Sequence, residues 1–115
     1  SANLSGTIEN TAGDKLNGLE IVLFAGQAPD GVELGRCSSV AEDTAQATVD
    51  GRFNFERIDW DFEDLENDEA VQKTGALKVY IEVHKEDASP YSLESGNISS
   101  LLPDANRSLR LVVQE

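Results

Sequence analysis

Between residues 76 and 85, apolar and polar side chains alternate, and this period of two constrains the fold more than any other feature of the sequence. A β-strand turns successive side chains to opposite faces, so strict alternation places one face against a core and the other toward water. The apolar positions are Leu77, Val79, Ile81 and Val83. The stretch therefore predicts a strand with one buried face.

Weaker runs of the same kind recur along the chain and are separated by turn residues. We expect further strands at about 4–10, 18–25 and 109–113, a weak strand at 91–95, and an edge strand or irregular crossing at 34–40. Two more runs, Ala45–Val49 and Arg52–Glu56, flank Asp50-Gly51. Because Asp-Gly is a strong two-residue turn signal, these runs predict a hairpin.

A chain of 115 residues is long enough for one core, so we expect a single domain over 1–115. Short strands with turns between them favour two packed antiparallel sheets over a parallel sheet covered by helices. The expected fold class is therefore all-β, an antiparallel two-sheet sandwich of about seven strands. One short helix is expected near 62–73, because Phe62 and Leu65 lie near helical spacing and acidic residues gather at its front.

Acidic residues are concentrated between the predicted hairpin and the strong strand, where seven of the eleven residues from Asp59 to Glu69 are Asp or Glu. Calcium takes about six to eight oxygen ligands, so clustered carboxylates offer a candidate calcium site. Its ligands would be Asp59, Asp61, Glu63 and Asp64. The segment is not an EF-hand, because Asp64 and Ala70 stand where that loop needs Gly and Glu. A solvated acidic face is the alternative interpretation.

The overall charge narrows the choice of partners. Twenty-two acidic residues against nine Lys and Arg give a net charge of −13, which repels phosphate backbones, so nucleic acid is not expected to bind. No apolar run approaches the ~20 residues of a membrane-spanning helix, so no membrane insertion is expected. Mutual repulsion slightly favours a monomer, although an edge strand at 34–40 offers a route to dimerisation.

Residues suited to catalysis are few. Cys37 is the only cysteine and His84 the only histidine, which excludes an intrachain disulfide and a structural Cys/His zinc site. Cys37 is expected to pack as a small hydrophobe. An enzyme would have to combine His84 with Glu82 or Glu86, yet His84 falls on the predicted solvated face. We therefore expect no catalytic residues, no enzymatic activity and no cofactor, with calcium as the alternative.

Two aromatic residues are candidates for ligand contact. Trp60 and Tyr91, with Phe62, would form an aromatic platform for a sugar. Burial at the end of a sheet, with the indole N–H of Trp60 bonded to a partner, is the alternative. Carbohydrate and protein thus both remain open as partners.

The order of several short patterns resembles a known superfamily. Leu4–Ile8 followed by Asp14–Leu23 is similar to a start of strand, turn and "G-hydrophobic-x-V-x-L", and Ala47–Phe55 is similar to "T-x-x-D-G-x-F-x-F". Ser108–Val113 is similar to its usual last strand. Together these patterns resemble the prealbumin-like superfamily, meaning transthyretin-like, carboxypeptidase regulatory-like and Cna B-type β-sandwich domains.

Two activities of that superfamily need residues that this chain lacks. The 5-hydroxyisourate hydrolases carry several histidines and end in Tyr-Arg-Gly-Ser, whereas this chain has His84 alone and ends in Val-Val-Gln-Glu. The isopeptide bond of Cna B domains joins a first-strand lysine to a last-strand asparagine. Here Lys15 follows the first strand and Asn106 precedes the last, so neither stands at the matching position.

The resemblance therefore implies a non-catalytic module for protein or carbohydrate interaction. It also implies an extracytoplasmic location, in the periplasm or on the surface of a bacterium. The alternatives are a calcium-binding structural or adhesion domain that uses residues 59–69 and, disfavoured by its missing residues, a transthyretin-like hydrolase.

Overall fold

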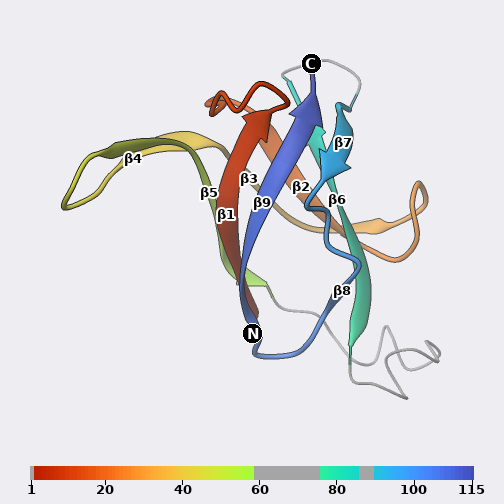
Figure 1. The fold of residues 1–115 in the computed structure, drawn as a ribbon. Helices are drawn as coiled ribbons and strands as arrows, with labels where there is room; N and C mark the ends of the chain where they lie inside the picture. The colour runs from red at the N-terminus through yellow and green to blue at the C-terminus, as the bar shows by residue number, and fades with distance from the viewer. Residues whose placement is uncertain (1, 59–75, 86–89) are drawn as a thin grey trace.

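In the computed structural model, residues 2–58, 76–85 and 90–115 are described. These residues form nine strands and contain no helix (Figure 1). The strands are β1 (Ala2–Asn10), β2 (Glu20–Ala25), β3 (Val32–Ser38), β4 (Val40–Asp43), β5 (Thr48–Ile58), β6 (Leu77–His84), β7 (Ser92–Ser95), β8 (Ser100–Leu101) and β9 (Asn106–Gln114). The helix expected near 62–73 lies outside the described residues.

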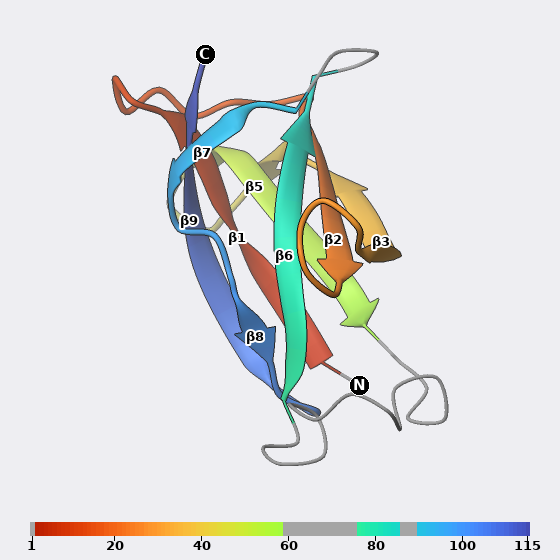
Figure 2. The same cartoon turned by 90° about the vertical axis from the view of Figure 1, so that its right-hand side faces the viewer.

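The strands make two sheets that pack face to face (Figure 2). The first sheet has the order β4-β5-β1-β9-β7 and the second has the order β3-β2-β6-β8. The predicted all-β, two-sheet architecture is thus confirmed, but the described strands number nine rather than about seven. The sequence did not single out β4, whose four residues are all exposed, or β8, which has only two residues, because neither can show a buried alternation.

The first and last strands run parallel, which corrects the expectation of wholly antiparallel sheets. The β1–β9 register extends from Asn3 opposite Asn106 to Asn10 opposite Val113. Parallel neighbours need a long connection, and here the chain supplies it by passing through the second sheet between the two strands. Gly6 marks their closest approach, because a Cβ atom there would overlap the carbonyl oxygen of Leu109.

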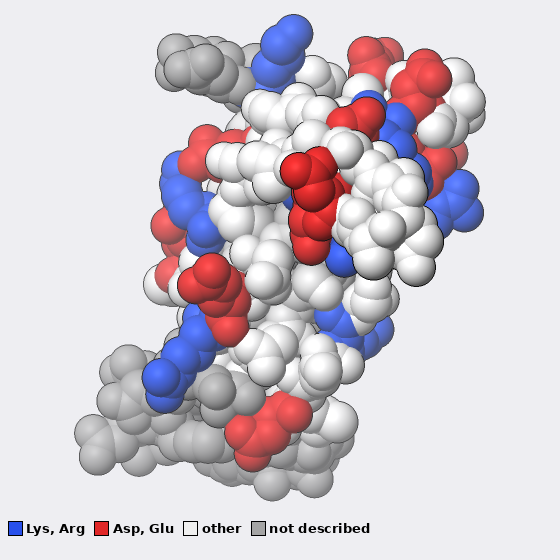
Figure 3. Space-filling model, turned by 90° about the vertical axis from the view of Figure 1, so that its left-hand side faces the viewer, with Lys and Arg blue, Asp and Glu red and all other residues white. Residues whose placement is uncertain are grey.

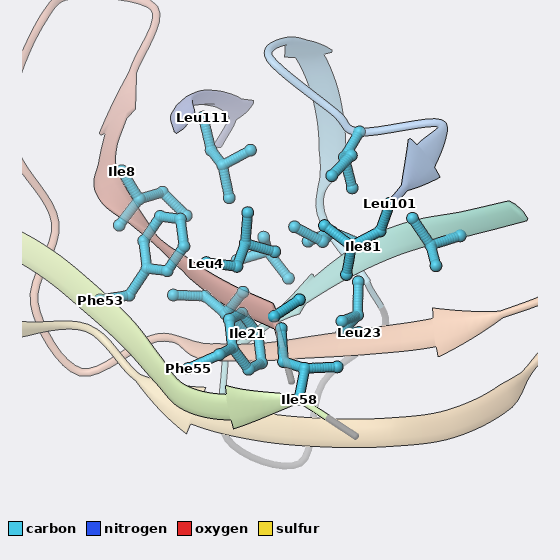
Figure 4. Packing of buried hydrophobic residues seen from close by; sticks show 14 of the residues in the cluster. Leu4, Ile8, Ile21, Leu23, Phe53, Phe55, Ile58, Ile81, Leu101 and Leu111 are labelled. Atoms are coloured by element: carbon cyan, nitrogen blue, oxygen red, sulfur yellow. The ribbon is translucent and has the colours of Figure 1, made fainter. Parts of the chain in front are cut away.

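The core lies between the sheets, where aliphatic and aromatic side chains from both layers point toward one another (Figure 4). Phe53 and Phe55 meet edge to face, with ring centroids 6.1 Å apart. The inward face predicted for residues 76–85 is confirmed, since its four apolar side chains are at most 2% exposed. Burying one such side chain contributes about 1.5–3 kcal/mol, so this face alone accounts for much of the attachment between the sheets.

The predicted solvated face of the same strand is only partly solvated. Tyr80 is 8% exposed, stacks on Phe24 with ring centroids 5.0 Å apart, and accepts a 3.0 Å hydrogen bond from the N–H of Gly31. A Cβ atom at Gly31 would lie 2.7 Å from the Tyr80 ring, so only glycine fits there. The loop at 26–31 therefore covers part of the outer face of the second sheet (Figure 2).

Asp50-Gly51 does not turn a hairpin, contrary to the sequence-based expectation. The strand β5 runs continuously through this pair, and β4 turns back onto it at 44–47, where the Thr44 hydroxyl donates a 2.6 Å hydrogen bond to the Ala47 carbonyl. In the β4–β5 register, Asp50 and Gly51 together face the single residue Ala41. The pair is therefore a β-bulge.

The bulge also connects β5 to the loop that precedes β2. Gly51 has a φ of 69°, and a Cβ atom there would lie 2.6 Å from the carbonyl oxygen of Ile8. Its N–H donates a 2.7 Å hydrogen bond to Oδ1 of Asn17, whose Nδ2 donates to the Asp50 carboxylate at 3.2 Å. Asp50-Gly51 thus fastens the loop before β2 against β5. The same residue types that favour a turn also favour a bulge, which is why the local pattern was ambiguous.

Candidate functional site

The two long sides of the sandwich differ in how their hydrogen bonds are satisfied. On one side β6 and β9 are bridged by residues 91–101, which run from β7 in the first sheet to β8 in the second (Figure 2). We call this side the closed seam. On the other side lie β3, at the margin of the second sheet, and β5 of the first sheet. We call that side the open seam.

In the closed seam, the segment 91–101 follows the margin of β6 from end to end. The Tyr91 N–H donates to the Val83 carbonyl at 2.8 Å, and the Val79 N–H donates to the Ser99 carbonyl at 3.2 Å. Between them the Asn97 side chain takes the place of a strand: Oδ1 accepts from the Ile81 N–H at 2.9 Å, and Nδ2 donates to the Ile81 carbonyl at 3.2 Å. The free side of β6 is thereby satisfied along most of its length.

The open seam has no such segment within the described ranges 2–58, 76–85 and 90–115. There β3 pairs with β2 on one side only, and β4 covers β5 only between Thr48 and Arg52. Between the two uncovered margins lies a groove of about 410 Å³. Its lining residues are Gly35, Arg36, Asn54, Phe55, Glu56, Arg57 and Ile58.

A missing side chain creates the hollow in this groove. Gly35 pairs with Leu23 in the neighbouring strand, so it occupies a position that faces inward like Leu23. A Cβ atom at Gly35 would meet the Phe55 ring at 3.7 Å, an ordinary contact distance. Because glycine has no side chain, the space above the edge of this ring stays empty. Phe55 itself is 4% exposed and forms the floor.

Cys37 ties the two strands together beside the groove. Its thiol hydrogen-bonds with the backbone of Asn54, and burial raises the pKa of the thiol to about 11. At neutral pH the thiol is therefore protonated and a poor nucleophile. The prediction that Cys37 packs as a small hydrophobe is confirmed, since its side chain is half-buried and lies against the core.

Arg36, one of the charged residues that line the groove, is already paired. Arg36 donates to both carboxylate oxygens of Glu33, at 2.5 and 3.2 Å, and also to Glu20. These bonds raise the pKa of the guanidinium and lower the pKa of the Glu33 carboxyl. From the side of β4, Figure 3 shows Lys and Arg next to Asp and Glu at several places. The groove therefore presents mixed charge rather than a field of one sign.

Most of the residues predicted as ligands lie outside the described residues, and the remaining one lies away from the groove. Trp60 and the four candidate calcium ligands, Asp59, Asp61, Glu63 and Asp64, lie outside the described residues. Tyr91 is half-buried, packs against the core, and belongs to the closed seam, so the structure places it on the side away from the groove. Within the described ranges, no three His, Cys, Asp or Glu side chains lie close enough together to hold a metal ion.

His84 has the carboxylate neighbour that an enzyme hypothesis required, but it lies away from the groove. Its Nε2 is 3.1 Å from Oε2 of Glu82, and its side chain is about a quarter exposed on the outer face of the second sheet. The groove is instead lined by β3 and β5, whereas both members of this pair lie on β6. The histidine therefore does not contribute to the candidate site.

A buried carboxylate on the first sheet was not foreseen from the sequence. Glu9 is 3% exposed, and Oε1 accepts from Lys15 at 2.9 Å and from Arg110 at 2.6 Å. Hydrogen bonds from Arg110 and Lys15 lower the pKa of this carboxyl to about 2. The cluster fastens the turn after β1 to the outer face of the sheet, since Lys15 belongs to that turn and Arg110 to β9.

The same cluster rules out an isopeptide bond between Lys15 and Asn106. The ammonium group of Lys15 lies at Glu9, near the end of β1, whereas Asn106 pairs with Asn3 near its beginning. Six residues of strand separate these two places, a distance of about 20 Å. The two side chains therefore do not meet.

Comparison with known proteins assigns this chain to no family. No family model matches the chain, and searches of curated proteins and of solved structures find no significant match either. In the described part of the chain, no helix is long and apolar enough to cross a membrane.

Proposed function

We propose that this chain is a non-catalytic β-sandwich module that binds a partner macromolecule in the groove of the open seam. One observation carries the proposal: the groove of about 410 Å³ lies between two strand margins that no described strand covers. Uncovered strand margins present unpaired N–H and C=O groups, and proteins normally cover, shorten or pair them. A groove along the β3 margin is therefore suited to receive a ligand that supplies hydrogen bonds.

The residues of the groove support binding rather than catalysis. Catalysis by a nucleophile needs a base within hydrogen-bonding reach and a pKa suited to proton transfer. Cys37, beside the groove, has a pKa of about 11, and the His84–Glu82 pair lies on β6, away from it. What the groove does offer is backbone, an aromatic floor and paired charges, which suit recognition.

We further propose a prealbumin-like fold and an extracytoplasmic, bacterial setting for the module. Support comes from the patterns at Leu4–Ile8, Asp14–Leu23 and Ala47–Phe55, and from the burial of Phe53 and Phe55 where those patterns place apolar residues. Fractionation of the producing cells tests the setting. Recovery of the native protein in the periplasm or at the surface is the expected result, and recovery in the cytoplasm would contradict it.

Filling the groove tests the binding role. Gly35→Leu places a side chain over Phe55, and Ser95→Leu places the same leucine side chain at an exposed position of β7 as a matched control. Wild type and both variants are probed with a phage-displayed library of linear peptides and with an array of oligosaccharides. We expect a ligand from one of these sets to bind wild type and Ser95→Leu but not Gly35→Leu, with all three proteins folded by circular dichroism.

Two results would contradict the binding role. A ligand that binds Gly35→Leu as well as wild type places the binding surface elsewhere on the molecule. Absence of binding from both sets to a folded wild-type protein also counts against the groove as a recognition site.

A further inference from the structure

We infer that the ligand of the open seam is an extended segment of a partner polypeptide, which adds to β3 as a fifth strand of the second sheet. A small apolar side chain of this segment fills the hollow between Gly35 and Phe55. The inference rests on the proposed function, because it names the kind of partner and its mode of binding in the same groove.

The first argument is the length and accessibility of the β3 margin. β3 extends over seven residues, Val32–Ser38, and among the described residues only β2 pairs with it. Seven residues of strand span about 23 Å, enough for three or four main-chain hydrogen bonds to a neighbouring strand. Val32, at the start of this margin, is 71% exposed. An extended polypeptide satisfies such a margin because its main chain has the matching spacing of donors and acceptors.

The second argument comes from the opposite side of the same molecule. At the closed seam the chain satisfies β6 with an extended segment of its own, and it also buries apolar side chains of that segment, Ile98 at 4% exposure and Leu101 at 1%. The sandwich thus already shows how such a margin is completed: main-chain or amide hydrogen bonds along the strand, and apolar side chains toward the core. The open seam offers the same two elements, a β3 margin that no described strand but β2 pairs with and a hollow that leads to the core.

The third argument concerns the hollow. Successive side chains of a strand point to opposite faces, so a segment paired with β3 would direct every second side chain toward Phe55. This space exists because Gly35 has no side chain. A Cβ atom at that position would lie 3.7 Å from the Phe55 ring. A small apolar side chain removes the remaining ring edge from water, whereas a charged one would lose its hydration without a partner.

Burial and charge in the groove favour a polypeptide over a sugar or an anion as the ligand. Phe55 is 4% exposed, so its ring offers no flat face on which a sugar can stack. Arg36 is held by Glu33 and Glu20, which leaves it little attraction for an anion. The net charge of −13 favours a segment with Lys or Arg at the positions that point away from the groove.

The experiment uses linear peptides selected from the phage-displayed library on the full 115-residue chain. Each selected peptide is synthesised in two forms, with the backbone N–H groups methylated at alternate residues in one form and at the intervening residues in the other. Methylation removes a donor and adds bulk, so only the set of N–H groups that faces β3 should matter. Affinity for wild type, Gly35→Leu and Ser95→Leu is then measured by calorimetry.

Strand addition predicts three results together. One methylated form binds at least about tenfold more weakly than the unmodified peptide, because several main-chain hydrogen bonds are lost, and the other form binds like the unmodified peptide. Gly35→Leu lowers the affinity by a similar factor, and Ser95→Leu leaves it unchanged. The selected sequences carry alternating small apolar residues and an excess of Lys and Arg.

Other outcomes separate this inference from the proposed function. If Gly35→Leu abolishes binding but both methylated forms bind normally, the groove binds partners without strand addition, and the inference is wrong. If only oligosaccharides bind in a Gly35-dependent way, or if a Gly35-dependent dimer forms in solution, the groove keeps its role while a foreign polypeptide is excluded. If Gly35→Leu leaves every interaction intact, both the inference and the proposed function fail.

Discussion

The closed seam and the open seam are built from comparable strands, yet the described residues complete only the closed seam. In the closed seam a single crossing segment, residues 91–101, satisfies β6 and places Ile98 in the core. In the open seam Gly35 leaves a hollow, and within the described part of the chain only Cys37 links the two strands near the groove through a hydrogen bond. The comparison shows that an extended segment can complete a strand margin in this fold, as residues 91–101 do for β6.

The comparison also separates stability from recognition. The closed seam buries Ile98 and Leu101 and bonds the Asn97 side chain to the backbone of Ile81, so changes to these residues should cost folding free energy. In the open seam, Gly35 is half-buried and Arg36 and Asn54 are exposed, so changes to these residues should alter binding while the fold persists. Four predictions test this division, beginning with the largest effect.

Gly96→Ala should destabilise the closed seam more than any other change considered. Gly96 has a φ of 91°, and a Cβ atom there would overlap the carbonyl oxygen of Arg110, so alanine is excluded by both its conformation and its volume. We expect the free energy of unfolding to fall by about 3 kcal/mol or more in urea titrations. A variant as stable as wild type would show that residues 91–101 do not lie tightly against β9.

Asn97→Ala should cost less, because it removes two hydrogen bonds without forcing the backbone apart. Ile81 then loses its partners for both N–H and C=O, and we expect a loss of about 1–3 kcal/mol by the same titration. Asn54→Ala in the open seam is the matched control, because both asparagine side chains are exposed and only that of Asn97 is hydrogen-bonded to the backbone of Ile81. It should change stability by less than about 0.5 kcal/mol. Equal losses of unfolding free energy in the two variants would contradict the proposed difference between the seams.

Acid should weaken the first sheet through Glu9. Its pKa is about 2 in the folded protein against an ordinary value of 4.5, so its contribution to stability is fully present above pH 4.5 and is lost as the pH falls toward 2. Wild type should therefore be more stable than Glu9→Gln at neutral pH, and this difference should shrink below pH 4.5 and disappear only below pH 2. A difference that does not depend on pH would mean that the carboxylate charge contributes nothing.

Gly35→Ala should have the smallest effect on folding. The new Cβ would make an ordinary 3.7 Å contact with Phe55, and Gly35 has no positive φ that an alanine would strain. Stability should stay within about 0.5 kcal/mol of wild type, while the affinity for groove-binding peptides should fall part of the way toward that of Gly35→Leu. A large loss of stability would show that the groove is part of the core rather than a binding surface.

Much of the fold could be predicted from local patterns. Alternation at residues 76–85 identified β6 and its inward face, because burial of every second side chain leaves a direct trace in the sequence. The weak pattern at 34–40 left an edge strand and an irregular crossing open, and the structure has the edge strand β3 at Val32–Ser38, where little burial is needed. The two-sheet architecture followed from many short strands with turns between them.

The rest depended on contacts between distant residues. Asp50-Gly51 was read as a turn, but the hydrogen bonds to Asn17 and the pairing with β4 make it a bulge. The role of Asn97 as a substitute for a strand neighbour depends on Ile81, 16 positions away. The groove itself arises from a glycine that faces Phe55, and nothing within the strand reveals what lies opposite. Only the appearance of Gly35 inside a predicted strand was a signal, since glycine there marks a close approach or a gap.

The parallel pairing of β1 and β9 has a mechanical consequence. Ala2 starts the first strand at one end of the sandwich and Gln114 ends the last strand at the other, as the positions of the two termini in Figure 1 show. A tension applied between those two points runs along both strands in opposite directions and loads their hydrogen bonds in shear. The bonds must then yield together rather than one after another, so the sheet resists stretching along this axis better than peeling from its side.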